Sequence, residues 1–139
     1  MTLQTSVDEV AGRVPITVIA LDGELDASNY EGFIDEVRRL YDEGSRHLLL
    51  DLTGLTFMAS SGLVALHSII RIMRGESLGD SELGWGAFHS LSEEVSSGSV
   101  QTDVRLAAPQ AAVERVLQRT GLDRLFPIHP DRATAISAF

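Results

Sequence analysis

The chain contains no cysteine and no lysine, so all eleven of its basic side chains are arginines. Without cysteine, disulfides, thiolate catalysis and cysteine-ligated metal centres are excluded. Without lysine, a Walker A nucleotide site and Schiff-base chemistry are excluded as well. The eleven positive charges face twenty acidic residues, which gives a formal net charge of −9. This balance argues against nucleic acid or an anionic membrane surface as a partner, because both would repel the protein.

Long apolar runs are also missing. No stretch approaches the roughly eighteen apolar residues that a membrane-spanning helix needs. The first ten residues, MTLQTSVDEV, lack the basic start and apolar run of a secretion signal. We therefore expect a cytoplasmic protein without membrane insertion. Its 139 residues suit one domain, residues 1–139, whose core needs no disulfide or metal.

The most apolar part of the sequence predicts a buried strand that leads into a buried helix. Residues 47–52 form the strand, and a short loop follows. A helix that is apolar on almost every face then starts at Ser60 and ends at Gly75. Such a pair must lie at the centre of the domain, since both elements need cover on several sides.

Before this pair, the sequence predicts a hairpin. Residues 3–7 alternate weakly and residues 16–21 are β-branched and apolar, with a turn at Gly12 between them. The acidic phrase at residues 22–26 is expected to break the second strand.

An amphipathic helix should follow the hairpin. It is expected to begin at Asp26 or Ser28, where Ser28 and Glu31 have the form of a capping box, and to end at Gly44. Its apolar stripe recurs at helical spacing and consists of Tyr30, Phe33, Ile34, Val37, Leu40 and Tyr41.

The last third of the sequence predicts two further strands and two further helices. These are a strand at 104–108, a helix over 112–117 ended by Gly121, an edge strand or extended segment at 126–129, and a last short helix capped by Asp131. Strands that alternate with helices require crossover connections. The prediction is therefore an α/β fold with a mixed, mostly parallel sheet of four to five strands and about four helices.

Residues 75–103 differ from the rest in composition. They hold five glycines, seven serines and six acidic residues, with no basic residue. We expect an acidic surface insertion in which Phe88, Leu91 and Val95 form one short helix. Trp85, Phe88 and Leu91 would either fold back on the domain or contact a partner or a second copy, as in a homodimer.

Three phrases in this order resemble the STAS domain of anti-sigma-factor antagonists. They are LDGELD at 21–26, LLDLTGLTFMASSGL at 49–63, and TGLDRLF at 120–126. The resemblance covers nearly the whole chain except residues 75–103, and it implies the STAS fold. It also implies a non-enzymatic switch without a cofactor.

The resemblance further implies the partners of such a switch. An anti-sigma factor, itself a serine kinase of the GHKL type, binds the unmodified antagonist and releases its sigma factor. The kinase then phosphorylates a serine at the start of the second helix, which breaks the complex, and a serine phosphatase resets it. Ser60 matches the phosphoacceptor position, with Ser61 as the alternative. The implied partner-binding residues are Asp22, Gly23, Glu24, Asp26, Met58, Ala59, Ser60, Ser61, Gly62 and Leu63.

One residue departs from the family pattern. The family usually carries Asp immediately before the acceptor serine, where this chain has Ala59. A second STAS function therefore stays open: partner binding without phosphorylation, for example as the soluble subunit of a lipid-transport ABC system.

Some of these residues also fit other interpretations. A serine at the start of a helix is a favoured cap, and Asp51 at a strand end suits a structural role. A hydrolase nucleophile elbow needs Gly two residues before the serine, but Met58 and Ala59 hold those places. The four histidines, His47, His67, His89 and His129, show no metal-ligand spacing, so no metal site is expected.

Overall fold

The computed structural model describes residues 2–75 and 103–139 of the chain. The described part forms one five-stranded sheet with strand order β1-β2-β3-β4-β5 and four α-helices. β1 is antiparallel to β2, and the other neighbouring strands are parallel. The predicted mixed α/β sheet is confirmed. The elements are β1 (Leu3–Ala11), β2 (Pro15–Leu25), α1 (Tyr30–Asp42), β3 (Leu48–Met58), α2 (Ser60–Met73), β4 (Val104–Ala107), α4 (Ala111–Thr120), the 3-10 turn η2 (Leu122–Arg124), β5 (Ile128–His129) and α5 (Arg132–Ala138).

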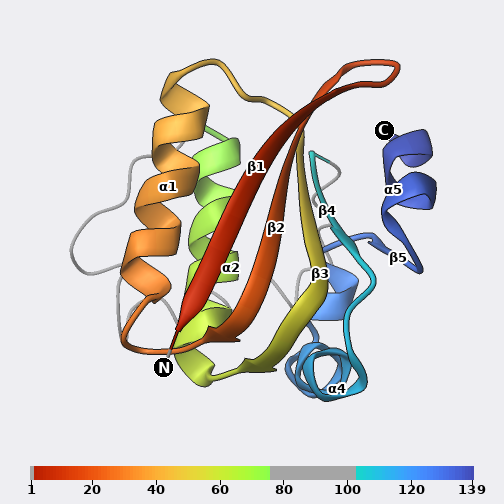
Figure 1. Ribbon diagram of the computed structural model, residues 1–139. Coiled ribbons are helices and arrows are strands. Elements are labelled where there is room, and N and C mark those ends of the chain that lie inside the picture. Colours follow the sequence, from red (N-terminus) through yellow and green to blue (C-terminus); the bar gives the residue numbers. More distant parts are fainter. Residues whose placement is uncertain (1, 76–102) are drawn as a thin grey trace.

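The strand and helix predicted to be central are central. β3 lies between β2 and β4, and its Leu48, Leu49 and Leu50 are fully buried. α1 and α2 lie side by side on one face of the sheet, whereas α5 lies on the other (Figure 1). α2 is buried along almost its whole length, and its side chains share one core cluster with those of α1, the sheet and the η2 segment. His67 within it is also buried, at 2% exposure.

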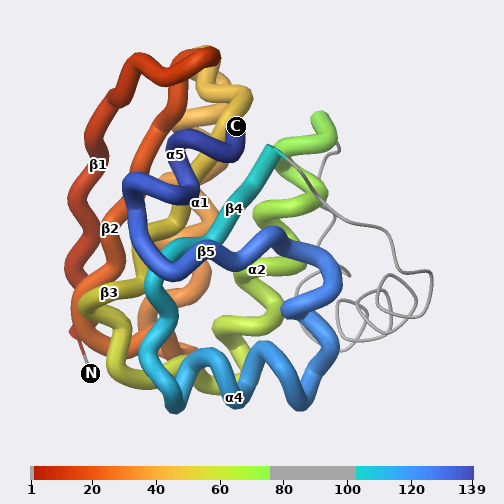
Figure 2. Tube along the Cα trace, turned by 90° about the vertical axis from the view of Figure 1, so that its right-hand side faces the viewer, coloured from red at the N-terminus to blue at the C-terminus, as the bar shows by residue number. Residues whose placement is uncertain are grey.

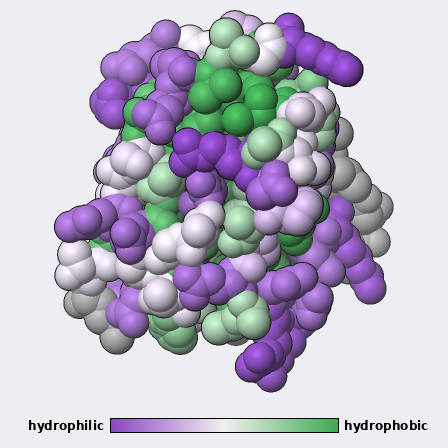
Figure 3. All heavy atoms as spheres, turned by 45° about the vertical axis from the view of Figure 1, so that its right-hand side comes forward, coloured by the Kyte–Doolittle hydropathy of each residue, from purple (hydrophilic) through white to green (hydrophobic). Residues whose placement is uncertain are grey.

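The second face of the sheet is only partly covered. α5 packs its Ala135 over Val18 and Leu49 to form a small apolar cluster. Val10 and Val14 at the hairpin tip pack against this cluster and stay half-exposed. Apolar side chains therefore gather on this face near the hairpin tip, with hydrophilic ones around them (Figure 3).

Two strands are longer than the sequence suggested. The phrase at residues 22–26 does not break β2, which runs to Leu25, and the expected loop after Leu52 is the second half of β3. The pairing of β2 with β3 shifts twice, between Ala20 and Asp22 and between Gly23 and Glu24. Each shift adds a residue to β3, so burial recurs every third residue and the period-two strand signal is lost.

The start of α1 also differs from the prediction. The helix begins at Tyr30 after Asn29, and no side chain of the described residues caps it. The proposed capping box fails because the Ser28 hydroxyl donates to Asp26 Oδ1, at 2.5 Å, instead of accepting from the helix. The apolar stripe is confirmed, with Phe33, Ile34, Val37 and Leu40 buried.

The ends of the later helices agree with the sequence. α4 ends at Gly121, which adopts a left-handed backbone with φ of 79°. Asp131 caps α5 by accepting a 2.7 Å hydrogen bond from the Thr134 N–H. β5 is a two-residue edge strand next to Pro127 and Pro130, as expected of a strand that lacks donors on both sides.

The expected contacts of Trp85, Phe88 and Leu91 and the helix through Val95 lie outside the described residues. Within residues 2–75 and 103–139, no helix has the length and apolar character that a membrane crossing requires.

Candidate functional site

The candidate site is the corner where β2 and β3 end together and α2 begins. Leu25 pairs with Met58 at the last position of the two strands. The Ala59 N–H then donates to the Leu25 carbonyl at 2.9 Å, which fixes the chain as it leaves the sheet. The start of α2 and the loop before α1 therefore lie next to each other at one end of the molecule (Figure 1).

Among residues 2–75 and 103–139, no side chain caps the amino end of α2. Ala59 holds the N-cap position with an extended backbone (φ −81°, ψ 175°), the geometry in which Ser, Thr, Asp or Asn would accept a hydrogen bond from the first turn. Ala59 offers only its carbonyl, which accepts from the Gly62 N–H at 2.9 Å. The first turn also contains no acidic residue. In the described part of the chain, neither a side-chain cap nor an acidic residue of the first turn offsets the partial positive charge of this helix end.

The two serines at this end differ in accessibility. Ser60 is exposed, whereas Ser61 is half-buried. The Ser61 Oγ is buried and has no hydrogen-bond partner among the described residues. A protein that modifies a hydroxyl at this corner would reach Ser60 first.

The acidic loop beside the serines is held by its own side chains. Asp26 Oδ1 accepts from the Ser28 N–H at 2.9 Å, and Asn29 Oδ1 accepts from the Asp26 N–H at 2.9 Å. Asn29 Nδ2 donates to the Glu24 carbonyl, also at 2.9 Å. The hydrogen bonds from the Ser28 hydroxyl and N–H lower the pKa of Asp26 below its usual value. The loop is therefore a fixed, ionised feature at neutral pH.

Some of the residues predicted to bind a partner lie on the surface of the corner, and others are buried beneath it. Asp22 and Ser60 are exposed, while Gly23, Glu24, Asp26, Ala59 and Ser61 are half-buried. Met58, Gly62 and Leu63 are buried, so their side chains lie beneath the surface. A Cβ on Gly62 would meet Met58 Cγ and would lie 3.2 Å from Leu25 Cδ2. Gly62 thus allows the first turn of α2 to pack closely against the ends of both strands.

Gly23 has a similar packing reason. Its φ of +114° suits glycine, and a Cβ there would collide with the Thr2 carbonyl oxygen. The same carbonyl accepts from the Glu24 N–H at 3.1 Å. Gly23 therefore lets the start of the chain close over the acidic loop.

Phe57 is a surface residue of this corner that is not among the site residues predicted from the sequence. Its side chain is 45% exposed, and only Phe57 and Val7 stand out as exposed large hydrophobics among the described residues. It lies opposite Glu24 in the ladder and two residues before Ala59. The sequence shows an apolar residue at this position. Because the second register shift comes just before it, period-two alternation does not predict that its side chain lies on the outer side.

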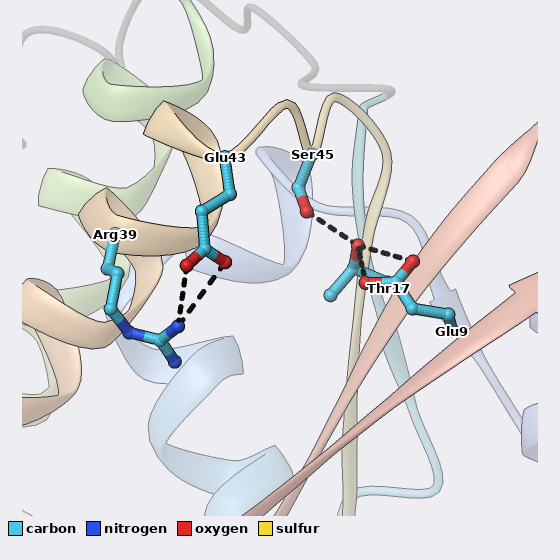
Figure 4. A network of polar contacts seen from close by, with 5 residues as sticks. All are labelled: Glu9, Thr17, Arg39, Glu43 and Ser45. Carbon is cyan, nitrogen blue, oxygen red and sulfur yellow. Dashed lines mark hydrogen bonds and ion pairs between the residues drawn. The ribbon is translucent and has the colours of Figure 1, made fainter.

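Other polar clusters in the described part do not assemble a comparable site. A hollow of about 470 Å³ lies at the opposite end of the sheet, between Glu9, Glu43 and His47. There the Thr17 hydroxyl contacts Ser45 Oγ at 2.8 Å and the Glu9 carboxylate at 3.3 Å (Figure 4). These groups already satisfy one another. Among residues 2–75 and 103–139, no group of His, Cys, Asp or Glu is placed to hold a metal ion.

The comparisons with solved structures agree on the fold. An anti-sigma factor antagonist from Mycobacterium paratuberculosis superposes with a TM-score of 0.70 at 22% identity, covering 99% of this chain and 93% of that chain. A Thermotoga maritima protein described as a candidate anti-sigma factor antagonist gives 0.68 at 21% identity, covering 95% and 91%. The antagonist SpoIIAA in its unphosphorylated form gives 0.55 at 18% identity, covering 93% and 89%.

A comparison with curated protein sequences finds no match. The model of the STAS domain family matches residues 8–77 and 81–135, which is most of the chain. The resemblance read from the sequence is confirmed, and the chain belongs to the STAS domain family.

Proposed function

We propose that this protein is an anti-sigma factor antagonist that binds an anti-sigma factor through the corner at the start of α2. The anti-sigma factor would be a serine kinase of the GHKL type, and phosphorylation of Ser60 would break the complex until a serine phosphatase removes the phosphate. The observation that carries the proposal is the exposed Ser60 hydroxyl on an uncapped helix end in a STAS fold. The structural similarity to anti-sigma factor antagonists supports the same assignment.

The helix end would accept a phosphate without rearrangement. A phosphate on Ser60 adds about −1.5 to −2 charges at neutral pH. The uncapped N–H groups of the first turn and the helix dipole favour an anion there by about 0.3–1 kcal/mol. Ala59 and the first turn contain no acidic side chain that would repel it. The phosphorylated chain should therefore keep its fold.

The partner would respond to charge at the same place. Phe57 and Ala59 give the corner an apolar centre beside Ser60, and Glu24 near the end of β2 and Asp26 just after it give the corner an acidic rim. At this centre the partner would place apolar groups, with its basic groups facing the acidic rim, so binding would strip water from the phosphate dianion, which costs several kcal/mol per ion. The acidic rim would favour a basic contact surface and salt-dependent association.

The proposal is tested by incubating the full chain with the cognate anti-sigma kinase and ATP and mapping the phosphate by mass spectrometry. We expect one phosphate, on Ser60, and its loss in Ser60→Ala but not in Ser61→Ala. Ser137→Ala is the matched control, because Ser137 is also exposed and lies on a helix on the other face of the sheet. Phosphate on Ser61 or on residues outside the corner would contradict the assignment.

Ala59 favours a second candidate function. With an apolar residue where the family carries Asp, the corner can serve as a permanent docking surface, as in the soluble STAS subunit of a lipid-transport ABC system. Affinity capture with the purified chain distinguishes the two. Recovery of an ATPase subunit without a GHKL kinase, together with no phosphate on Ser60, would favour the transport role.

A further inference from the structure

The outer edge of β1 is the longest unpaired strand edge in the described part of the molecule. β1 has nine residues and pairs only with β2, and no described segment lies beyond it (Figures 1 and 2). Its register with β2 runs from Leu3 to Ala11 without a shift. The strand contains no proline, glycine or lysine, the usual features that keep an edge from pairing. The opposite edge, β5, is two residues long and lies next to prolines.

The hydrogen bonds at the two ends of the hairpin show which groups of β1 point outward. Glu24 N–H donates to the Thr2 carbonyl, and Gly12 N–H donates to the Val14 carbonyl. Bonded pairs alternate along an antiparallel ladder, so the even-numbered residues of β1 bond to β2. The N–H and C=O groups of Leu3, Thr5, Val7, Glu9 and Ala11 therefore face away from the sheet. Pro15, which has no N–H, fits this phase because it lies opposite Ala11.

The two charged side chains of β1, Asp8 and Glu9, both contact groups of the chain itself, so they do not keep another strand from pairing at this edge. The Glu9 carboxylate accepts from the Thr17 hydroxyl of β2, and Asp8 lies 3.6 Å from an Arg132 nitrogen of α5 (Figure 4 shows Glu9). Val7, which precedes these two acidic residues in β1, has a side chain that is 37% exposed. As far as the described residues go, the edge thus presents unpaired backbone groups around an exposed apolar side chain.

We propose that this edge pairs with the same edge of a second copy, antiparallel and about a two-fold axis at Val7, to give a continuous ten-stranded sheet. In this register all five outward residues of one copy bond to those of the other. Val7 faces Val7, Thr5 faces Glu9 and Leu3 faces Ala11. Asp8 faces Ser6, so no acidic residue lies opposite another.

Registers shifted by one residue either place like charges opposite each other or leave outward backbone groups unpaired. An axis at Asp8 sets two carboxylates opposite each other, and like charges directly opposite destabilise a strand pair. An axis at Ser6 leaves the outward groups of Ala11 unpaired. Self-complementarity at Val7 favours a second copy of this chain as the occupant of the edge.

The paired sheet would keep the two Ser60 corners apart. The start of β1 lies at that corner, because Leu3 pairs with Gly23. Antiparallel pairing places the two starts at opposite ends of the joined sheet. The dimer would present two separate corners, and the inference stands whether or not the proposed function is right.

Sedimentation equilibrium of the full chain over a range of concentrations and salt tests the proposal. We expect a monomer–dimer equilibrium that strengthens with salt, because each copy carries a net charge of −9. Val7→Pro should weaken it by about tenfold or more, since it removes one outward N–H per copy and no bond to β2. A chain that stays monomeric at about 1 mM, or an unchanged Val7→Pro dimer, would overturn the proposal.

Cross-linking tests the register and does not depend on the proline variant folding. The chain has no cysteine, so Val7→Cys introduces a single thiol. Paired Val7 positions would be about 5.5 Å apart at Cα, within disulfide range. Ala11→Cys is the matched control, because two Ala11 positions would be about 27 Å apart at about 3.4 Å per residue. Oxidation should give covalent dimers of the first variant only. Equal cross-linking of both, or none with Val7→Cys, would contradict this register.

Discussion

Arg132 and Asp51 form the ion pair that ties the last helix to the centre of the sheet. Arg132 Nη2 and Nε lie 2.9 and 3.0 Å from Asp51 Oδ2. The other carboxylate oxygen accepts from the Thr53 N–H and hydroxyl at 3.1 and 2.6 Å. Burial raises the pKa of Asp51, but the Thr53 hydrogen bonds and the Arg132 guanidinium outweigh it and hold the pKa below its usual value. The structural role expected of Asp51 is thus met in the middle of β3, not at its end.

Removing the arginine should destabilise the fold. Arg132→Met leaves the Asp51 carboxylate, 11% exposed, without its cation. Because the Arg132 side chain is 37% exposed, we expect a loss of about 1–3 kcal/mol, below the cost of breaking a fully buried pair. Urea unfolding measures it. Arg38→Met is the control: its pair with Asp35 is solvent-exposed and 3.8 Å long, so it should change stability by less than about 0.5 kcal/mol.

The same carboxylate predicts a pH dependence. Its folded pKa lies below the unfolded value, so the folded state binds fewer protons in the interval between them. Its contribution is complete above pH of about 4 and is lost as the pH falls toward the folded pKa. Asp26 and Asp131 have lowered pKa values too and act in the same interval. The test is therefore a difference: Asp51→Asn should lose less stability than the parent chain between about pH 4 and pH 2. Parallel curves would contradict the prediction.

Close packing of α2 on the strand ends predicts opposite effects at two helical glycines. Gly62→Ala should cost about 1–3 kcal/mol, because the new Cβ would meet Met58 and lie 3.2 Å from Leu25 Cδ2. Gly32→Ala in α1 should stabilise by about 0.5–1 kcal/mol, since nothing lies within 4 Å of its Cβ position. Thermal unfolding of both variants decides the matter. A neutral or stabilising Gly62→Ala would show that this contact is loose.

Phe57 and Val7, the large exposed hydrophobic residues of the described part, should separate two kinds of binding. Phe57→Ser should weaken binding of the anti-sigma factor by at least about tenfold while leaving self-association intact. Val7→Ser should weaken self-association and leave partner binding intact. Neither change should alter unfolding by more than about 1 kcal/mol, because both side chains are already partly in water. Equal loss of partner binding in the two variants would contradict the assignment of Phe57 to the docking corner.

Local signals predicted much of the fold. Gly121 and Asp131 were found because a left-handed cap and a helix N-cap depend on neighbours in sequence. α2 was found because burial on all sides leaves few polar residues. The full length of β3 was not predicted, because its register shifts remove the alternation that identifies a strand. The Asp51–Arg132 ion pair was not predicted, because its two residues are 81 positions apart and no local pattern connects them.

The candidate site was predicted less completely. The family phrases located Ser60 and the acidic loop, but they could not divide the corner into surface and support. That Met58 and Leu63 are buried while Phe57 is exposed depends on how α2 packs against the strand ends.

The central claim is that Ser60 carries a charge switch on a docking surface. The most direct measurement is calorimetric titration of the cognate anti-sigma factor with the unmodified chain and with the chain phosphorylated on Ser60. We expect affinity to fall by about 100-fold or more on phosphorylation, with the melting temperature nearly unchanged. Equal affinities for the two forms would contradict the account.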